Sequence, residues 1–221
     1  MEREEASKPG VGDDVTSVFA GEPLTREERN ALLGRRGATV WFTGLSGAGK
    51  TTLSAAVERA LMADGHMTYR LDGDDVRRHL CRDLGFDREA RAENVRRVAE
   101  VARVLADAGV IVLVALISPY AADRDSARVL HAEIGLPFLE VFIDTPVDIC
   151  RSRDPKGLYA RAGSGELHML TGVDDPYEPP QDPDVHVEPQ PLAQSVQAVL
   201  RGLSRAGVAN GVRSAAQKPV A

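Results

Sequence analysis

Short runs of apolar residues alternate with amphipathic stretches along most of the chain. The first run, ATVWFT at 38–43, is rich in β-branched and aromatic residues and predicts a strand. Apolar residues then recur at helical spacing from Lys50 to Gly65, where glycine is expected to end the helix. The same alternation continues with a strand at 67–71, a helix ending near 109, strands at 110–117 and 138–143 around a helix at about 121–134, a helix from about 146, a short strand near 185 and a last helix through 192–203. This order predicts a parallel sheet covered by helices on both faces.

Three segments lack this periodicity. Residues 1–24 and 206–221 carry charge, glycine and proline, and we expect a flexible arm and a flexible tail. Residues 25–205 should therefore form one folded domain. Within it, residues 154–183 form a polar stretch rich in Gly, Pro, Asp and Tyr.

Composition excludes several classes of protein. With 221 residues, 43% of them hydrophobic, the chain can bury the core of one ordinary domain. A net charge of −6 argues against a general nucleic-acid or anionic-membrane partner. The longest apolar run is far shorter than the roughly 20 residues of a membrane span, and the acidic N-terminus is no secretory signal. The two cysteines, Cys81 and Cys150, cannot build a disulfide framework, so we expect a cytoplasmic location and packing roles for both. The five histidines show no metal spacing.

The segment GLSGAGKT at 44–51 matches the pattern G-x-x-x-x-G-K-[ST]. Its glycines let successive backbone N–H groups point at phosphates, and the helix that follows adds its positive dipole end. Lys50 would reach the β- and γ-phosphates and Thr51 would hold Mg²⁺. A chance glycine-rich turn is the alternative, but the match lies between a predicted strand and an amphipathic helix, as the mechanism requires. Of four lysines, only Lys50 and Lys156 lie outside the expected tails.

An acidic cluster, DGDD at 72–75, follows the second predicted strand. Strand ends gather on the phosphate side of a parallel sheet, so a carboxylate here could deprotonate an acceptor hydroxyl. The alternative is a helix N-cap, and different Asp residues could fill the two roles. A hydrolytic motor or a GTPase would place an Asp after a buried strand to help hold Mg²⁺, and Asp144 stands at such a position. However, the chain is short for a motor and lacks a guanine-specificity sequence. A small-molecule kinase is favoured.

Seven motifs stand in order: GLSGAGKTT, LDGDDVR, LGF, ENVRRVAEVA, ISPY, RDPKGLY and TGVDDPYEPP. Over about residues 25–205 the chain resembles the adenylylsulfate kinase (APS kinase) family, which converts APS to PAPS with ATP. The resemblance implies a three-layer α/β P-loop NTPase fold with a mostly parallel five-stranded sheet and a mobile lid at about 154–183. It also implies ATP and Mg²⁺ as ligands, commonly a homodimer, and a possible coupling to ATP sulfurylase.

The resemblance further implies roles for individual residues. ATP would lie on Gly44, Leu45, Ser46, Gly47, Ala48, Gly49, Lys50, Thr51, Thr52 and the lid residue Arg153. APS would contact Asp72, Asp74, Arg77, Phe86, Arg91, Asn94, Ile117, Ser118, Pro119, Lys156 and Leu170. Asp74 is the expected base and, with Thr51, a metal ligand. Ser118 is a catalytic candidate beside Lys50 and Asp74, although direct in-line transfer needs no phosphoserine, so we expect it to shape the pocket.

Simpler explanations and departures from the family pattern remain. Phe86 could be core, Arg91 and Asn94 a solvated helix face, and Lys156 a solvated loop lysine. The family usually has DGDN where Asp75 stands here, an acidic residue at Ala90, and a Gly-Phe-Thr-Gly lid where this chain has Leu170 in place of Phe. A stacked Phe would contribute about 0.5–1.5 kcal/mol on the purine that Leu lacks. A kinase for another hydroxylated acceptor and a non-catalytic nucleotide-binding module therefore stay open.

Overall fold

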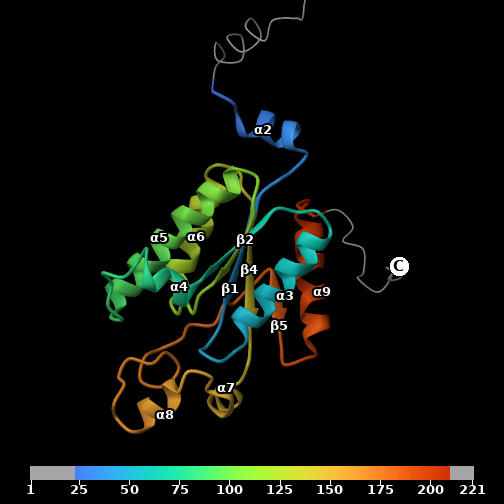
Figure 1. Cartoon of the computed structure of the whole chain (residues 1–221). Helices are drawn as coiled ribbons and strands as arrows, with labels where there is room; N and C mark the ends of the chain where they lie inside the picture. The colour runs from blue at the N-terminus through green and yellow to red at the C-terminus, as the bar shows by residue number, and fades with distance from the viewer. Residues whose placement is uncertain (1–22, 210–221) are drawn as a thin grey trace, which may run out of the picture.

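The fold is a single parallel sheet between two layers of helices (Figure 1). A computed structural model describes residues 23–209. The expected arm at 1–24 and tail at 206–221 therefore lie mostly outside the described residues. Packing extends past residue 206, because Val208 and Ala209 are buried against the core.

The strands are β1 (Ala38–Thr43), β2 (Thr68–Asp72), β3 (Ile111–Ala115), β4 (Phe138–Ile143) and β5 (Val185–Val187). They pair in the order β2-β3-β1-β4-β5, and every pairing is parallel. The long helices are α3 (Lys50–Ala63), α5 (Arg88–Asp107), α6 (Ala121–Ala132) and α9 (Leu192–Arg205). The predicted class, with five strands and helices on both faces, is confirmed.

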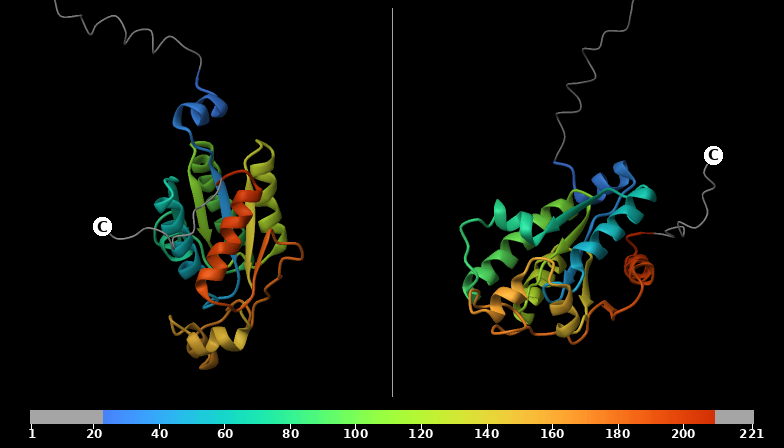
Figure 2. Two further views of the ribbon diagram at one scale, coloured as in Figure 1. Left: turned by 90° about the vertical axis from the view of Figure 1, so that its right-hand side faces the viewer. Right: turned by 60° about the horizontal axis from the view of Figure 1, so that its bottom comes forward.

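Alternation along the central strands builds the two faces of the sheet. Val40 and Phe42 of β1 pack in one apolar cluster with α3 and α9, whereas Trp41 packs in the other with α5 and α6. Figure 1 shows α5 and α6 on one side of the sheet and α3 and α9 on the other, and the left view of Figure 2 brings α9 to the front. Side chains of a central strand are thus buried on both faces, so its sequence reads as a continuous apolar run.

Four short helices complete the fold: α2 (Arg26–Leu33), α4 (Gly73–Arg78), α7 (Val147–Arg153) and α8 (Leu158–Gly163). The apolar pattern does not predict α2, which buries no residue. Its signal is a capping box, in which the Thr25 hydroxyl accepts from the Glu28 N–H and the Glu28 carboxylate accepts from the Thr25 N–H. Nor does that pattern predict α4 as a separate element.

The carboxyl ends of the strands gather at one edge of the sheet, where the 154–183 segment crosses (Figures 1 and 2). The loop after β1 lies at this edge, as do Asp72 at the end of β2 and the 116–120 loop after β3. None of the helices in residues 23–209 is long and apolar enough to cross a membrane.

Candidate active site

The 44–51 loop joins β1 to α3 in a conformation that depends on glycine. Gly44, Gly47 and Gly49 have φ values of 145°, 77° and 108°, a region that other residues rarely adopt. The Lys50 Nζ donates to the carbonyl oxygens of Gly44 (2.9 Å) and Leu45 (2.8 Å), so the lysine lies folded over the loop. Backbone N–H groups and a lysine around one curled loop are the arrangement that binds phosphates.

Burial lowers the pKa of Lys50 from 10.5 to about 8. Desolvation is the main cause, and the positive charge of Lys156 adds to it. Asp72 and Asp74 act in the opposite direction but do not compensate. The loop therefore holds an undercompensated cation at the position where a polyphosphate would place negative charge.

A cavity of about 620 Å³ begins at this loop and extends along the carboxyl edge of the sheet. This volume lies in the range of small-molecule sites. The following sequence-predicted residues line it: Ser46, Gly47, Ala48, Gly49, Lys50, Thr51, Thr52, Asp72, Asp74, Arg77, Phe86, Arg91, Asn94, Ile117, Ser118, Pro119, Arg153 and Lys156. Gly44 and Leu45 do not line it but contact Lys50 through their carbonyl groups, and Leu170 lies outside it.

The two carboxylates of the acidic cluster have different surroundings. Asp72 is 9% exposed and is the N-cap of α4, where its carboxylate accepts from the Asp74 N–H (3.1 Å). The same carboxylate accepts from the Thr51 hydroxyl (2.8 Å). Asp74 is half-exposed and forms an ion pair with Lys156 of the 154–183 segment. Both residues line the cavity, but the N-cap is Asp72 and the carboxylate paired with Lys156 is Asp74.

These oxygen donors fit Mg²⁺. Thr51, Asp72 and Asp74 offer a hydroxyl and two carboxylates, and Mg²⁺ is usually held by one or two carboxylates together with waters and substrate phosphates. In residues 23–209 no group of three or more His, Cys, Asp or Glu side chains forms a dedicated metal cage. Asp72, which contacts Thr51 directly, joins Thr51 and Asp74 as a candidate ligand.

Phe86 lines the same cavity as the phosphate loop, together with Arg77 and Arg91. Its side chain is 61% exposed, so it is not a core residue. The guanidinium of Arg77 lies 4.6 Å from the ring centroid and that of Arg91 lies 6.0 Å from it. An exposed ring fixed by two cations offers a flat apolar surface on which a base could stack.

Arg91 and Asn94 lie one turn apart on α5, and both are buried. The Arg91 guanidinium donates from Nε to the Phe86 carbonyl (2.7 Å) and from Nη2 to the Met169 carbonyl (2.6 Å), so it joins the stacking surface to the 154–183 segment. Asn94 is 5% exposed, and its side-chain oxygen has no hydrogen-bond partner. A buried polar atom that lines a cavity without a partner is costly, so a ligand donor would stabilise it. Neither residue belongs to a solvated helix face.

Ser118 lines the cavity, but its hydroxyl is already engaged. The Trp41 Nε1 donates to Ser118 Oγ (3.1 Å), and the residue is 3% exposed. Its φ of 41° is left-handed, one of three such non-glycine residues among those described. This geometry agrees with a residue that shapes the wall of the cavity.

Leu170, a predicted APS contact, lies in the apolar core. Its side chain is 6% exposed and belongs to the apolar cluster that contains α3 and α9. The N–H groups of Met169 and Leu170 donate to the carboxylate of Asp174, which closes a tight turn around them. In this arrangement Leu170 packs in the core and does not line the cavity, so its predicted contact with APS would require the 154–183 segment to move.

We accordingly expect Leu170→Phe to lower stability without tightening substrate binding. A larger side chain in a packed core typically costs about 1–3 kcal/mol of unfolding free energy. Urea unfolding and the KM for the acceptor measure the two effects. A tenfold lower KM at unchanged stability would show that residue 170 does cover the substrate.

The sequence analysis missed one side of the cavity. The residues that follow β5 form it: Val187, Glu188, Pro189, Gln190, Leu192 and Ser195. Thr145, after β4, lies beside them, and its hydroxyl donates to the Ala48 carbonyl (3.0 Å). The available signal was their place at the carboxyl end of a parallel strand, where ligands of such sheets bind.

Residues 36–188 match the family model described as Adenylylsulphate kinase. The chain belongs to the APS kinase family. It is 50% identical to the adenylyl-sulfate kinase of Citrobacter koseri over 194 residues, which cover 88% of this chain and 96% of that protein. The Yersinia pestis adenylyl-sulfate kinase is 49% identical and covers 86% of this chain and 90% of its own length.

Solved APS kinases have the same fold. The Mycobacterium tuberculosis APS kinase CysC, in complex with AMPPNP and APS, superposes with a TM-score of 0.75 at 50% identity, covering 77% of this chain and 99% of that one. A hexameric APS kinase from Thiobacillus denitrificans matches with a TM-score of 0.60 at 33% identity, and the match covers 30% of that longer chain. Asp75, Ala90 and Leu170, where the sequence was expected to depart from the family pattern, thus stand in a chain that is 50% identical to an adenylyl-sulfate kinase.

Proposed function

We propose that this protein transfers the γ-phosphoryl group of ATP to the 3′-hydroxyl of APS, giving PAPS and ADP. One observation carries the proposal: a single cavity joins the Lys50 loop to Asp74 and continues to Phe86, Arg91 and Asn94. The first part suits a polyphosphate. The second offers a stacking surface, a buried guanidinium and an unpartnered amide, which suit an adenine nucleotide that carries an anionic group.

The reaction needs little covalent chemistry from the protein. The bond between the γ-phosphorus and its bridging oxygen breaks as a bond to the 3′-oxygen forms, and the hydroxyl proton passes to the Asp74 carboxylate. Lys50, with the loop N–H groups, stabilises the negative charge on the transferring phosphoryl group. Mg²⁺, held by Thr51 with Asp72 and Asp74, would add charge neutralisation. Ser118 forms no phosphoryl intermediate in this scheme, because the phosphoryl group passes directly from ATP to the acceptor hydroxyl.

Lys156 links the 154–183 segment to the chemistry. In the structure it pairs with Asp74. Once anionic substrates enter, the lysine has a stronger set of partners in their phosphate or sulfate groups, which would release the Asp74 carboxylate to accept a proton. Closure of the segment over both ligands would exclude water, which otherwise competes for the γ-phosphate.

The test is ADP release by the purified protein with ATP and Mg²⁺, with and without APS. Release that depends on APS, together with PAPS formation, supports the proposal. Release with other hydroxylated nucleotides but not with APS would indicate a kinase for a different acceptor. Nucleotide binding without turnover for any acceptor would indicate a binding module.

The lowered pKa of Lys50 also predicts that the protein takes up protons when ATP binds. At about pH 8.5 a lysine of pKa about 8 is partly neutral, and bound phosphates raise that pKa again, so ATP binding should take up protons. Calorimetry in two buffers of different ionisation enthalpy measures this uptake, and Lys50→Met should abolish it. An equal uptake in the variant would assign the proton to another group.

Four further features belong to the proposal. A homodimer and a functional coupling to ATP sulfurylase rest on the family resemblance. Mobility of the 154–183 segment rests on the requirement that substrates enter beneath it. A location in the reducing cytoplasm is supported by Cys81 and Cys150, which are both free and buried.

A further inference from the structure

The loop after β3 forms one wall of the cavity in a conformation that requires support. Ile117, Ser118 and Pro119 line the cavity, and Ser118 has a φ of 41°. A non-glycine residue in this region is strained and persists only where its surroundings fix it. Side chains of neighbouring elements hold this loop, here called the β3–α6 wall (residues 117–119).

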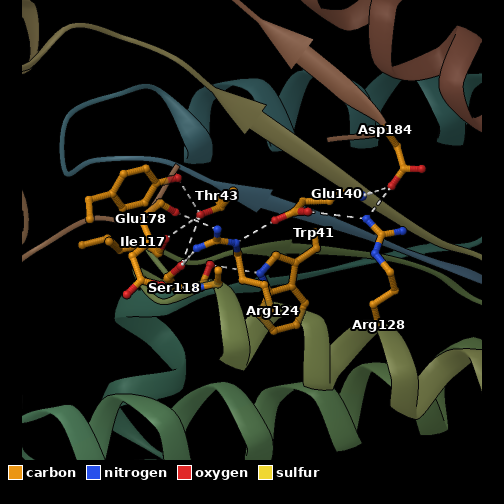
Figure 3. A network of polar contacts seen from close by, with 11 residues as sticks. Trp41, Thr43, Ile117, Ser118, Arg124, Arg128, Glu140, Glu178 and Asp184 are labelled. Atoms are coloured by element: carbon orange, nitrogen blue, oxygen red, sulfur yellow. Dashed lines mark hydrogen bonds and ion pairs between the residues drawn. The ribbon is translucent and has the colours of Figure 1, made fainter. Parts of the chain in front are cut away.

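Arg124 of α6 contacts the wall and two neighbouring parts of the chain (Figure 3). Its Nη1 donates to the Ser118 carbonyl, its Nη2 to the Glu178 carbonyl and its Nε to the Glu140 carboxylate of β4, each at 2.7 Å. The side chain is 2% exposed, and it does not line the cavity. One guanidinium thus joins the wall, the sheet and residue 178, near the end of the 154–183 segment.

Other contacts join the same three parts. The Glu178 N–H donates to the Pro119 carbonyl (2.8 Å), and the Glu178 carboxylate accepts from the Ala121 N–H (2.7 Å). The Thr43 hydroxyl donates to the Ile117 carbonyl (2.7 Å) and lies 2.9 Å from the Tyr177 hydroxyl. Residues 177–178, near the end of the 154–183 segment that carries Lys156 and Met169, are therefore bound to the wall.

We propose that Arg124 is a positioning residue for the acceptor side of the cavity, where it holds both the β3–α6 wall and residues 177–178 in place for the acceptor. That this acceptor is APS rests on the proposed function. Only the planar fork of arginine places donors in these three directions at once, and lysine, a single point charge, cannot replace it.

The buried ion pair with Glu140 is poorly explained by stability alone. Replacing such a pair by apolar residues of similar volume is often neutral or stabilising, whereas removing one partner is strongly destabilising. A double variant, Arg124→Met with Glu140→Leu, therefore removes the fork and leaves no isolated buried charge. Arg124→Lys is the second variant, because it keeps the charge opposite Glu140 but loses the fork.

Two controls separate positioning from general loss of stability. Arg128→Met removes the neighbouring arginine, which contacts Glu140 (3.5 Å) and Asp184 (2.8 Å) but not the wall. Leu203→Ala makes a cavity in the apolar cluster on the other face of the sheet, and should destabilise the fold without touching the wall.

The experiment compares the KM for APS, the KM for ATP and kcat in these variants, together with hydrogen exchange of the Glu178 amide in the absence of substrates. We expect both Arg124 variants to raise the KM for APS about tenfold or more, with the KM for ATP within about twofold. The Glu178 amide should exchange about tenfold faster, because its partner on the wall is no longer held. Both controls should keep the wild-type KM for APS.

The proposal is overturned if a folded Arg124 variant keeps the wild-type KM for APS, or if its KM for APS and its KM for ATP rise by the same factor. If the double variant does not fold, the Arg124→Lys variant decides by the same criteria. A wild-type protein that shows no reaction with APS would contradict the proposed function. Hydrogen exchange would then decide the positioning role by itself, since it needs no acceptor.

Discussion

Replacing Lys50 by methionine is expected to lower kcat by about 10³-fold while the protein stays folded. A preorganised donor aimed at the transferring group typically contributes 10²–10³ to the rate, and the methionine keeps the apolar stem but loses the charge. The structure adds a second expectation, which concerns stability. Because burial lowers the pKa of Lys50 to about 8, the unfolded chain binds this proton more tightly than the folded one does.

At neutral pH the charged lysine therefore weakens the fold, and its removal should leave the Tm unchanged or raise it. This destabilisation is present below about pH 8 and disappears as the pH rises toward the unfolded pKa of Lys50. Arg59→Met is a suitable control, since Arg59 is an exposed cation on the same helix, α3. Near-wild-type turnover in folded Lys50→Met, or equal losses in both variants, would contradict the assigned role.

Asp74→Asn is expected to lower kcat by about 10²–10⁴-fold with little change in the KM for APS. The amide keeps the shape of the side chain but cannot accept the proton of the attacking hydroxyl. It also loses the ion pair with Lys156, a half-exposed contact of small energy, so the Tm should change little. Steady-state kinetics at saturating ATP separates the chemical step from acceptor binding.

Asp75→Asn is the matched control, because it changes the neighbouring carboxylate, which is exposed and pairs with Arg78 (3.1 Å) outside the cavity. We expect kcat within about twofold of wild type for this variant. An unchanged kcat in Asp74→Asn would move the base elsewhere. Asp72 would be the next candidate, although its carboxylate already accepts from the Thr51 hydroxyl and from the Asp74 N–H.

Elements with strong periodicity were predicted within a few residues of their positions in the structure. The expected strand at 138–143 is β4, and the expected helix at about 121–134 is α6, which ends at Ala132. Helix α2 was not predicted, because its capping box is its only strong sequence signal and it packs no apolar face against the core. A search by apolar periodicity finds helices that bury a stripe, and α2 buries none.

The phosphate loop could be predicted because its chemistry is local. Glycines with positive φ, a following helix and a lysine lie within eight consecutive residues, so spacing alone specifies the site. The place of Phe86 depends on more distant contacts. The sequence did not decide whether Phe86 belongs to the core or lines the cavity. In the structure its side chain is exposed, and the guanidinium groups of Arg77 and Arg91 lie against its ring.

The sequence by itself determined the parallel α/β class, the phosphate loop and many of the residues that line the cavity, but not those after β4 and β5. Tertiary structure alone decided the burial of Leu170, the division of work between Asp72 and Asp74, and the fork of Arg124. Each of these depends on groups far apart in the chain: Thr51 meets Asp72, Lys156 meets Asp74, and Arg124 meets the Glu178 carbonyl. Periodicity and motifs report short-range order, whereas partners across 20 residues or more are set by how the elements pack against one another.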